Sequence, residues 1–261
     1  MEKKMFCYQC EQTAGCTGCT GNAGVCGKKA DTAKLQDELT GALIGLARAV
    51  DGAETISTKT GQIILEGLFT TVTNVNFDNA AIENMIQKVR AEKERLVPDC
   101  SKCQAPCGRT DDYDMQQLWN ADEDIRSLKS LILFGIRGMA AYAYHANVLN
   151  YEDAEVDHFF CEALFKIGYE ESVETLLPTV LKVGEINLKC MALLDKANTE
   201  TYGTPEPTDV TLTIEKGPFI IVTGHDLRDL QLLLEQTEGK GINIYTHGEM
   251  LPAHAYPFLK K

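Results

Sequence analysis

The sequence lacks the long apolar runs and the basic surface that several classes of protein require. No apolar run approaches the ~20 residues needed to cross a bilayer. Only 25 lysines and arginines stand against 38 aspartates and glutamates, which gives a formal net charge of −13 at pH 7. Binding to nucleic acid or to an anionic membrane needs a positively charged surface. The composition therefore predicts neither a nucleic-acid partner nor a membrane partner.

The first residues also lack the apolar core of a secretory signal. Residues 1–5, MEKKM, lead directly into a cysteine-rich segment. We therefore expect a cytoplasmic protein whose ten cysteines are reduced thiols or metal ligands, because disulfide-rich domains belong to exported proteins. No repeat of fixed period is present, which argues against a solenoid.

Five of the ten cysteines lie within the first 26 residues, at positions 7, 10, 16, 19 and 26. Thiolates this close together, separated by glycines that let backbone amides approach a bound ion, are typical of an iron–sulfur or zinc site. The successive short gaps of bacterial ferredoxins are absent, so the segment is not that of an ordinary ferredoxin. A structural zinc site is the alternative, with Cys7 and Cys10 as one pair and Cys16 and Cys19 as the other.

Beyond these cysteines the pattern is helical as far as residue 198. Asp31 or Thr32 is expected to cap a first helix with a stripe of apolar residues, namely Leu35, Leu39, Leu43, Leu46 and Val50. Similar helical segments lie at 79–96, 121–149, 151–168 and 171–198. The part from Leu131 to Ala146 is apolar around nearly its whole circumference, which places it in the middle of a bundle.

The pattern changes after residues 201–208, where two prolines and a glycine end any helix. Residues 219–222 and 242–245 read as buried strands, and residues 226–237 as an amphipathic helix between them. This is a β-α-β unit, whose carboxyl-end loops are where α/β folds place ligands. The alternating segment Val210 to Ile214 is a candidate for one further strand.

The sequence thus predicts a mainly α fold: an N-terminal iron–sulfur loop and helical bundle, followed by the start of an α/β, Rossmann-like domain. We assign the loop and bundle to residues 1–200 and the partial α/β domain to residues 209–261. An isolated pair of parallel strands is marginally stable and needs cover on both faces. The α/β part therefore looks incomplete, which indicates either a truncated chain or completion by another chain.

Several motifs resemble those of a known family. The motif FCYQCEQTA at residues 6–14 is followed by Cys19, by GVCGK at 24–28 and by AKLQD at 33–37. Segments 67–78 and 138–149 continue the similarity, and the stretch from TGHDL at 223–227 to THGEMLPAH at 246–254 is its most specific part. Together these residues resemble the N-terminal half of hybrid cluster proteins, also called prismane proteins or hydroxylamine reductases. Members of that family are about twice as long as this chain.

The resemblance implies a set of cluster ligands. Cys7, Cys10, Cys19 and Cys26 match the cysteines that hold a [4Fe–4S] or [2Fe–2S] cluster in the family, which leaves Cys16 as an additional thiol. His247 matches a histidine that ligates iron in the hybrid iron–sulfur–oxygen cluster. Without the resemblance, the position of His247 after a strand fits a core polar residue and a site residue equally well.

The other cysteines have no assigned role in the family pattern. Residues 100–109 form a second thiol-rich loop in which Cys100, Cys103 and Cys107 offer three ligands without an obvious fourth. Free thiols, a redox pair, or a metal shared with Cys16 are the alternatives there. Cys161 and Cys190 fall on helix faces and are expected to be small core residues.

The resemblance implies an oxidoreductase that reduces hydroxylamine to ammonia, or reduces nitric oxide, with electrons delivered by a donor protein to the N-terminal cluster. The remaining ligands of the hybrid cluster come from the second half of family members. We therefore expect a truncated form that carries the electron-transfer cluster only and is inactive alone, and that forms the hybrid cluster only if the missing half is supplied. The alternatives are a non-catalytic iron–sulfur electron-transfer or sensor module and a structural zinc protein.

Overall fold

The computed structural model describes residues 5–7, 9–10, 18–50, 56–72, 76–97 and 111–260. The chain divides into two compact units. The first contains residues 1–144 and 153–190, and the second contains residues 145–152 and 191–261. The long helix α7 (Val173–Tyr202) contributes to both units, since the division falls between Cys190 and Met191.

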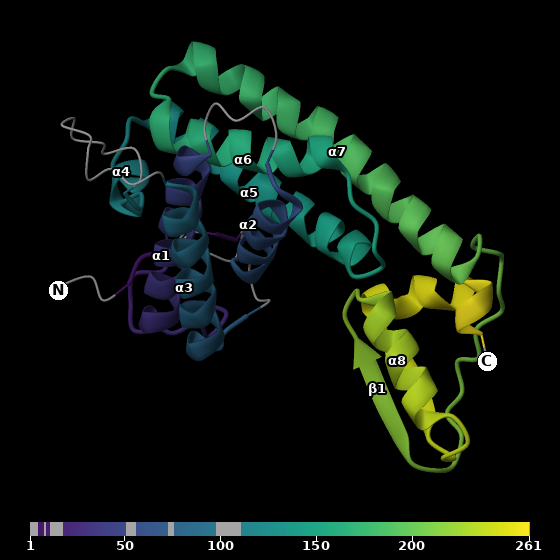
Figure 1. The fold of residues 1–261 in the computed structure, drawn as a ribbon. Helices are drawn as coiled ribbons and strands as arrows, with labels where there is room; N and C mark the ends of the chain where they lie inside the picture. The colour runs from purple at the N-terminus through teal and green to yellow at the C-terminus, as the bar shows by residue number, and fades with distance from the viewer. Residues whose placement is uncertain are drawn as a thin grey trace. The chain divides into compact units, whose positions relative to one another are not determined.

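The first unit is helical, as expected (Figure 1). Its elements are α1 (Ala30–Ala49), α2 (Thr58–Thr70), α3 (Asn79–Leu96), α4 (Met115–Trp119), most of α5 (Glu123–Asn147), α6 (Ala154–Tyr169) and the first part of α7. The helices that apolar periodicity predicts are confirmed. The helix α2 was not predicted, and it begins where the Ser57 hydroxyl accepts a hydrogen bond from the backbone amide of Thr60.

The helix α1 lies at the core of this unit and contacts α2, α3, α4 and α6. The middle of its apolar stripe is buried as expected, since Leu39, Leu43 and Leu46 have no exposed surface, and the ends of the stripe, Leu35 and Val50, are half-buried. The predicted cap is wrong. The residue that precedes the helix is Lys29, and the Asp31 carboxylate accepts from the backbone amide of Thr32 inside the first turn.

The helix α5 is less enclosed than its composition suggests. Ile132, Ile136 and Met139 are buried in the core of the first unit. Leu131 is 57 % exposed and Tyr142 is 40 % exposed. These two residues are eleven positions apart and therefore share one side of the helix. The expectation that α5 is buried all round is wrong, because the described helices cover only its other side.

The second unit contains the expected β-α-β arrangement. The strands β1 (Phe219–Thr223) and β2 (Asn243–His247) pair in parallel, with Phe219 opposite Asn243 and Thr223 opposite His247. Between them, α8 (Leu227–Thr237) begins at Asp226, whose carboxylate accepts from two backbone amides of the first turn. After β2 the chain forms the 3₁₀ helices η3 (Gly248–Ala255) and η4 (Pro257–Leu259).

The segment from Val210 to Ile214 forms no strand, so that expectation is wrong. Its alternating side chains find no described partner: Leu212 is 95 % exposed and Ile214 is 84 % exposed. A strand needs a neighbouring strand to satisfy its backbone groups, and alternation alone does not supply one.

The two-stranded sheet is covered on one face. Residues from α7, α8 and the 3₁₀ helices form a small apolar cluster with Val222 and Ile244 of the strands. On β1, Phe219 is 60 % exposed and Ile221 is 64 % exposed. Parallel sheets are normally covered on both faces. The face of β1 that carries Phe219 and Ile221 is therefore open within the described part of the chain.

In the segments that the structure describes, no helix combines the length and the apolar character that crossing a bilayer would require.

Candidate metal centre

Two of the expected ligands are joined through the backbone. Cys7 and Cys19 form an isolated antiparallel bridge, in which the Cys7 amide donates to the Cys19 carbonyl at 3.1 Å and the Cys19 amide donates to the Cys7 carbonyl at 2.7 Å. Gly18 precedes Cys19 with φ +128°, and a Cβ there would come within 2.7 Å of the Phe6 ring. The glycine therefore permits the close approach of these two chain segments.

A short turn presents Cys26. An antiparallel bridge joins Ala23 to Lys29, and the Gly24 amide donates to the Lys28 carbonyl at 2.8 Å. A Cβ built on Gly24 would lie 3.5 Å from Cys26 Sγ and 3.8 Å from Cys19 Sγ. The Cys19 and Cys26 sulfurs thus lie around one point next to this turn. The two bridged segments together bring Cys7, Cys19 and Cys26 into one region, ahead of α1.

The surroundings of these cysteines are largely apolar. Cys19 is 7 % exposed and packs with Met5 and Ala33. Phe6 contacts the ring of Trp119 edge to face, with the ring centroids 5.7 Å apart. Burial raises the pKa of the Cys7 thiol, against the smaller lowering effects of a backbone hydrogen bond and of the Lys28 charge. Binding of a metal ion at this thiol would release its proton.

A buried cation lies beside the cysteines. Lys28 is 1 % exposed, and its Nζ donates to Gln36 Oε1 at 2.6 Å. The backbone of Gln36 in turn accepts from the Thr40 hydroxyl, which also accepts from Arg137 at 2.6 Å. Asp37 is a further charged residue near Lys28 and Arg137. Burial raises the pKa of Asp37 to about 6, against the effects of Arg137, Trp119 and Lys28.

The described residues do not close a complete set of ligands. Cys10 is half-buried on the loop after Cys7, and Cys16 lies outside the described residues. Within the described segments, no three Cys, His, Asp or Glu side chains come together as metal ligands do. The structure thus brings three of the four expected cysteines into one region without drawing their sulfurs into a coordination shell.

The remaining cysteines divide into two groups. Cys100, Cys103 and Cys107 lie outside the described residues. Cys161 and Cys190 are buried in the helical core, which confirms that they are core residues. Burial raises the pKa of Cys190 to about 12, and its thiol donates to the Met139 carbonyl.

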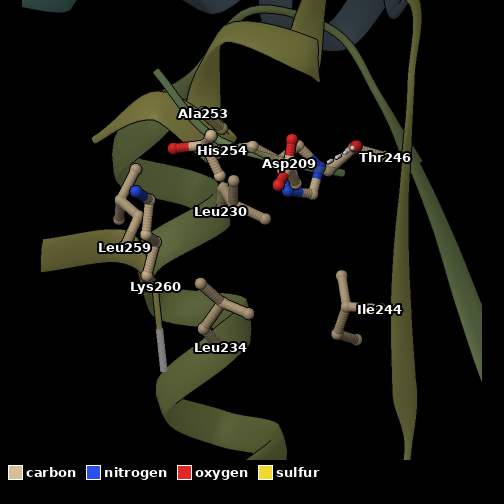
Figure 2. A pocket seen from close by; sticks show the side chains of 10 residues that line it. Asp209, Leu230, Leu234, Ile244, Thr246, Ala253, His254, Leu259 and Lys260 are labelled. Carbon is tan, nitrogen blue, oxygen red and sulfur yellow. Dashed lines mark hydrogen bonds between the residues drawn. The ribbon is translucent and has the colours of Figure 1, made fainter. Parts of the chain in front are cut away.

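His247 is the last residue of β2 and is exposed. It does not line the pocket of about 490 Å³ that lies beside this strand. Figure 2 shows Leu230 and Leu234 of α8 on one side of that pocket and Ile244 of β2 on the other. Thr246 also lines the pocket, and neighbouring residues of a strand point to opposite faces. His247 therefore belongs to the other face of β2.

The pocket has one polar corner. The Thr246 hydroxyl and His254 Nε2 are 2.6 Å apart and hydrogen-bonded, and Asp209 lies next to them (Figure 2). The sequence did not indicate His254 as a pocket residue, because its partner Thr246 is eight positions away in a different element. This pocket shares none of the expected metal ligands.

Two further histidines lie next to carboxylates in the second unit. His145 Nδ1 lies 3.5 Å from an Asp226 carboxylate oxygen. Burial alone would raise the pKa of Asp226, but the hydrogen bond from His145 and two backbone amides hold it below its usual value. His225 immediately precedes Asp226 and contacts Glu249. Both contacts lie at the carboxyl ends of the two strands.

Lys28 is the site residue that the sequence did not indicate. It is followed by Lys29, which is exposed, and nothing in the residue types distinguishes these two lysines. Its role depends on a hydrogen bond to Gln36, which is eight residues away on α1. A basic residue within two positions of a candidate cysteine ligand is the signal that would have singled it out.

Three similar proteins carry the name hydroxylamine reductase. The chain is 45 % identical over 282 residues to the hydroxylamine reductase of Porphyromonas gingivalis, which covers 100 % of this chain and 51 % of that protein. The hydroxylamine reductase of Thermodesulfovibrio yellowstonii is 47 % identical over 280 residues, and that of Methanocella arvoryzae is 45 % identical over 291 residues. These matches cover 98 % of this chain and 51 % and 52 % of the two relatives.

The chain therefore spans about half the length of the curated relatives that it matches. The family model that describes the Prismane/CO dehydrogenase family matches residues 5–261, which include the bridged cysteine loops, the helical unit and the β-α-β unit. The chain belongs to the Prismane/CO dehydrogenase family.

Proposed function

We propose that this chain holds an iron–sulfur cluster on Cys7, Cys10, Cys19 and Cys26 and is the electron-transfer part of an oxidoreductase of the hydroxylamine reductase type. The observation that supports it best is the pair of bridged segments that brings Cys7, Cys19 and Cys26 together beside a buried ammonium. The names of the relatives supply the reaction class.

The chemistry of these residues fits such a cluster. Four thiolates are the usual ligand set of [4Fe–4S] and [2Fe–2S] clusters, and they give the site a net negative charge. The buried Lys28 ammonium is in no ion pair among the described residues, and an unpaired buried cation is costly. An anionic cluster next to Lys28 would remove that cost. The apolar surroundings of Cys19 would limit access of water to its sulfur.

A cluster of this kind, when bound, accepts and donates single electrons. The residues of this chain position it: the Cys7–Cys19 bridge fixes two ligands, and the turn between Ala23 and Lys29 presents a third. We propose that a donor protein in the cytoplasm supplies the electrons, and that hydroxylamine or nitric oxide is the substrate in proteins of the relatives' full length.

His247 has a conditional role in this proposal. We assign it as an iron ligand of the hybrid cluster only where the remaining half of the relatives' length is present. In the 261-residue chain its side chain is exposed, so we expect it to carry no iron. If the second half of a relative is supplied, His247→Ala should abolish substrate reduction and leave the spectrum of the N-terminal cluster unchanged. Iron bound at His247 in the 261-residue chain would contradict this assignment.

Two other functions are separated from this one by metal content and activity. A structural zinc protein would bind zinc at the same cysteines and would be colourless. A non-catalytic sensor or electron-transfer module would bind the cluster but would not support hydroxylamine reduction when the second half of a relative is supplied.

Single Cys→Ala variants test the proposed ligands. Loss of Cys7, Cys10, Cys19 or Cys26 should lower the iron content of anaerobically purified protein several-fold, because each removes a ligand that couples the cluster to folding. Cys190→Ala is the matched control, since that cysteine is buried in the helical core away from the bridged segments. If Cys16→Ala removes the iron and Cys19→Ala leaves it in place, the ligand assignment is wrong.

A further inference from the structure

The starting observation is a buried lysine that forms no salt bridge with a carboxylate of the described residues. Lys28 is 1 % exposed, and its ammonium donates to the neutral amide oxygen of Gln36 at 2.6 Å. The Phe77 ring lies 5.8 Å from the same ammonium. Among the described residues, Lys28 takes part in no ion pair within 4.0 Å. Buried ammonium groups are normally paired, because moving an isolated charge out of water is costly.

The ammonium is held firmly in place. Gln36 has no exposed surface, and its Nε2 donates to the backbone carbonyl of Asn76 at 3.0 Å. That bond fixes the amide so that Oε1 faces Lys28. The adjacent Lys29 has the same charge but is exposed. The two lysines thus provide a buried and a solvated positive charge at neighbouring positions.

Lys28 lies beside the cysteines. A Cβ built on Gly24 would be 3.8 Å from Lys28 Cβ, 3.5 Å from Cys26 Sγ and 3.8 Å from Cys19 Sγ. The Lys28 charge also acts on the Cys7 thiol. Cys19 and Cys26 therefore lie next to the turn that carries Lys28, and Cys7 is close enough for the Lys28 charge to act on its thiol. Among the described residues, Asp37 and Arg137 are further charged groups near this site, and their charges are opposite in sign.

We propose that Lys28 is a positioning residue whose buried ammonium is the fixed counter-charge of the cluster on Cys7, Cys10, Cys19 and Cys26 and sets its reduction potential. This inference rests on the proposed cluster. One-electron reduction adds one negative charge to the cluster. A positive charge fixed nearby in a poorly solvated site stabilises the reduced form more than the oxidised form, and so raises the potential.

The test is a redox titration of the full chain, followed by visible absorption and by the electron paramagnetic resonance signal of the reduced cluster. Lys28→Met removes the charge and keeps the length of the side chain. It should lower the ratio of reduced to oxidised cluster at least tenfold at a fixed applied potential, which for one electron is a shift of 59 mV to more negative values. Lys28→Arg keeps the positive charge, so its cluster should titrate close to the wild-type potential. Lys29→Met makes the same change in net charge at the exposed position and should shift the ratio much less.

Gln36→Glu provides a second measurement in case Lys28→Met does not retain iron. It places a carboxylate against the ammonium, and it should also move the potential to more negative values. If the wild-type chain binds a cluster and these variants titrate at its potential, the role of Lys28 is refuted while the proposed function stands. If the wild-type chain binds no iron and sulfide, both proposals fail.

Discussion

Glu92 illustrates how a single residue of the helical unit is stabilised. Its side chain on α3 is 1 % exposed and pairs with Lys59 at 2.9 Å and with Arg95 at 2.6 Å. It also accepts a hydrogen bond from the Thr60 hydroxyl at 2.8 Å, which ties α3 to the first turn of α2. The hydrogen bonds from Arg95, followed by those from Lys59 and Thr60, lower the pKa of Glu92 to about 2 in spite of its burial.

The effect of replacing the Glu92 carboxylate on the free energy of unfolding should depend on pH. Because the pKa of Glu92 falls from 4.5 to about 2 on folding, its ionised form stabilises the fold above pH 4.5, and that contribution is lost as the pH falls toward 2. Glu92→Gln should lower the free energy of unfolding at pH 7 by roughly 2 kcal/mol, since it weakens three hydrogen bonds to a charged group. Urea denaturation of both proteins between pH 3 and pH 7 measures the difference. A difference that stays constant over this range would contradict the assignment.

At the residue scale, the sequence identifies candidate ligands better than it identifies the hydrogen-bond partners of single side chains. The cysteine spacing and the family motif singled out Cys7, Cys10, Cys19 and Cys26, and the structure brings three of them into one region. The buried state of Lys28 could not be predicted, because it depends on the packing of the 23–29 turn against Gln36. The cap predicted at Asp31 or Thr32 failed for a related reason: Thr32 donates its hydroxyl to Asn79 on α3, and Asp31 accepts from the Asn79 amide.

At the level of elements, glycines decide how closely α1 packs against neighbouring segments. A Cβ on Gly41 of α1 would overlap the backbone carbonyl oxygen of Tyr113, and the Tyr113 amide donates to the Gly41 carbonyl at 3.0 Å. A Cβ on Gly67 of α2 would lie 2.7 Å from a methyl group of Leu43. The glycines of α2 also explain why the sequence did not predict this helix. Its two glycines disfavour a helix in isolation, and packing against α1 overrides that preference.

Two alanine substitutions in helices separate packing from helix propensity. Gly41→Ala should lower the free energy of unfolding by roughly 1–3 kcal/mol, because the new methyl group collides with backbone that cannot rotate away. Gly184→Ala on α7 is the control, since apart from the neighbouring backbone of its own helix no described atom lies within 4 Å of its Cβ position. That change should raise stability by up to about 1 kcal/mol through helix propensity. Thermal or urea unfolding measures both, and equal effects of the two substitutions would contradict this account of the α1 contact.

The same reasoning explains which strands the sequence predicted. β1 and β2 were predicted because they are short apolar runs on either side of an amphipathic helix, and the parallel pairing is confirmed. The segment from Val210 to Ile214 has the alternation of a strand but no described strand to pair with, and it is exposed. The local sequence pattern therefore identified the two strands that pair with each other, and it wrongly predicted a third strand at a segment that has no described strand to pair with.

At the level of the whole molecule, the central feature is that the chain spans about half of the relatives that it matches. Among the described residues, His247 belongs to no group of three or more Cys, His, Asp or Glu side chains that could hold a metal ion. We therefore expect the 261-residue chain to accept electrons without reducing hydroxylamine. An anaerobic assay with reduced viologen dye measures this directly. Ammonia formation at a rate typical of enzymes, above ~1 per second, would contradict the expectation and would require a different active site.

The most direct measurement is the metal and sulfide content of the anaerobically purified chain, together with its visible absorption before and after dithionite. The account predicts iron and acid-labile sulfide in equal amounts, with a visible absorption that bleaches on reduction, because [4Fe–4S] and [2Fe–2S] clusters both contain one sulfide per iron. A colourless chain that binds zinc, or one that binds no metal at these cysteines, would contradict it.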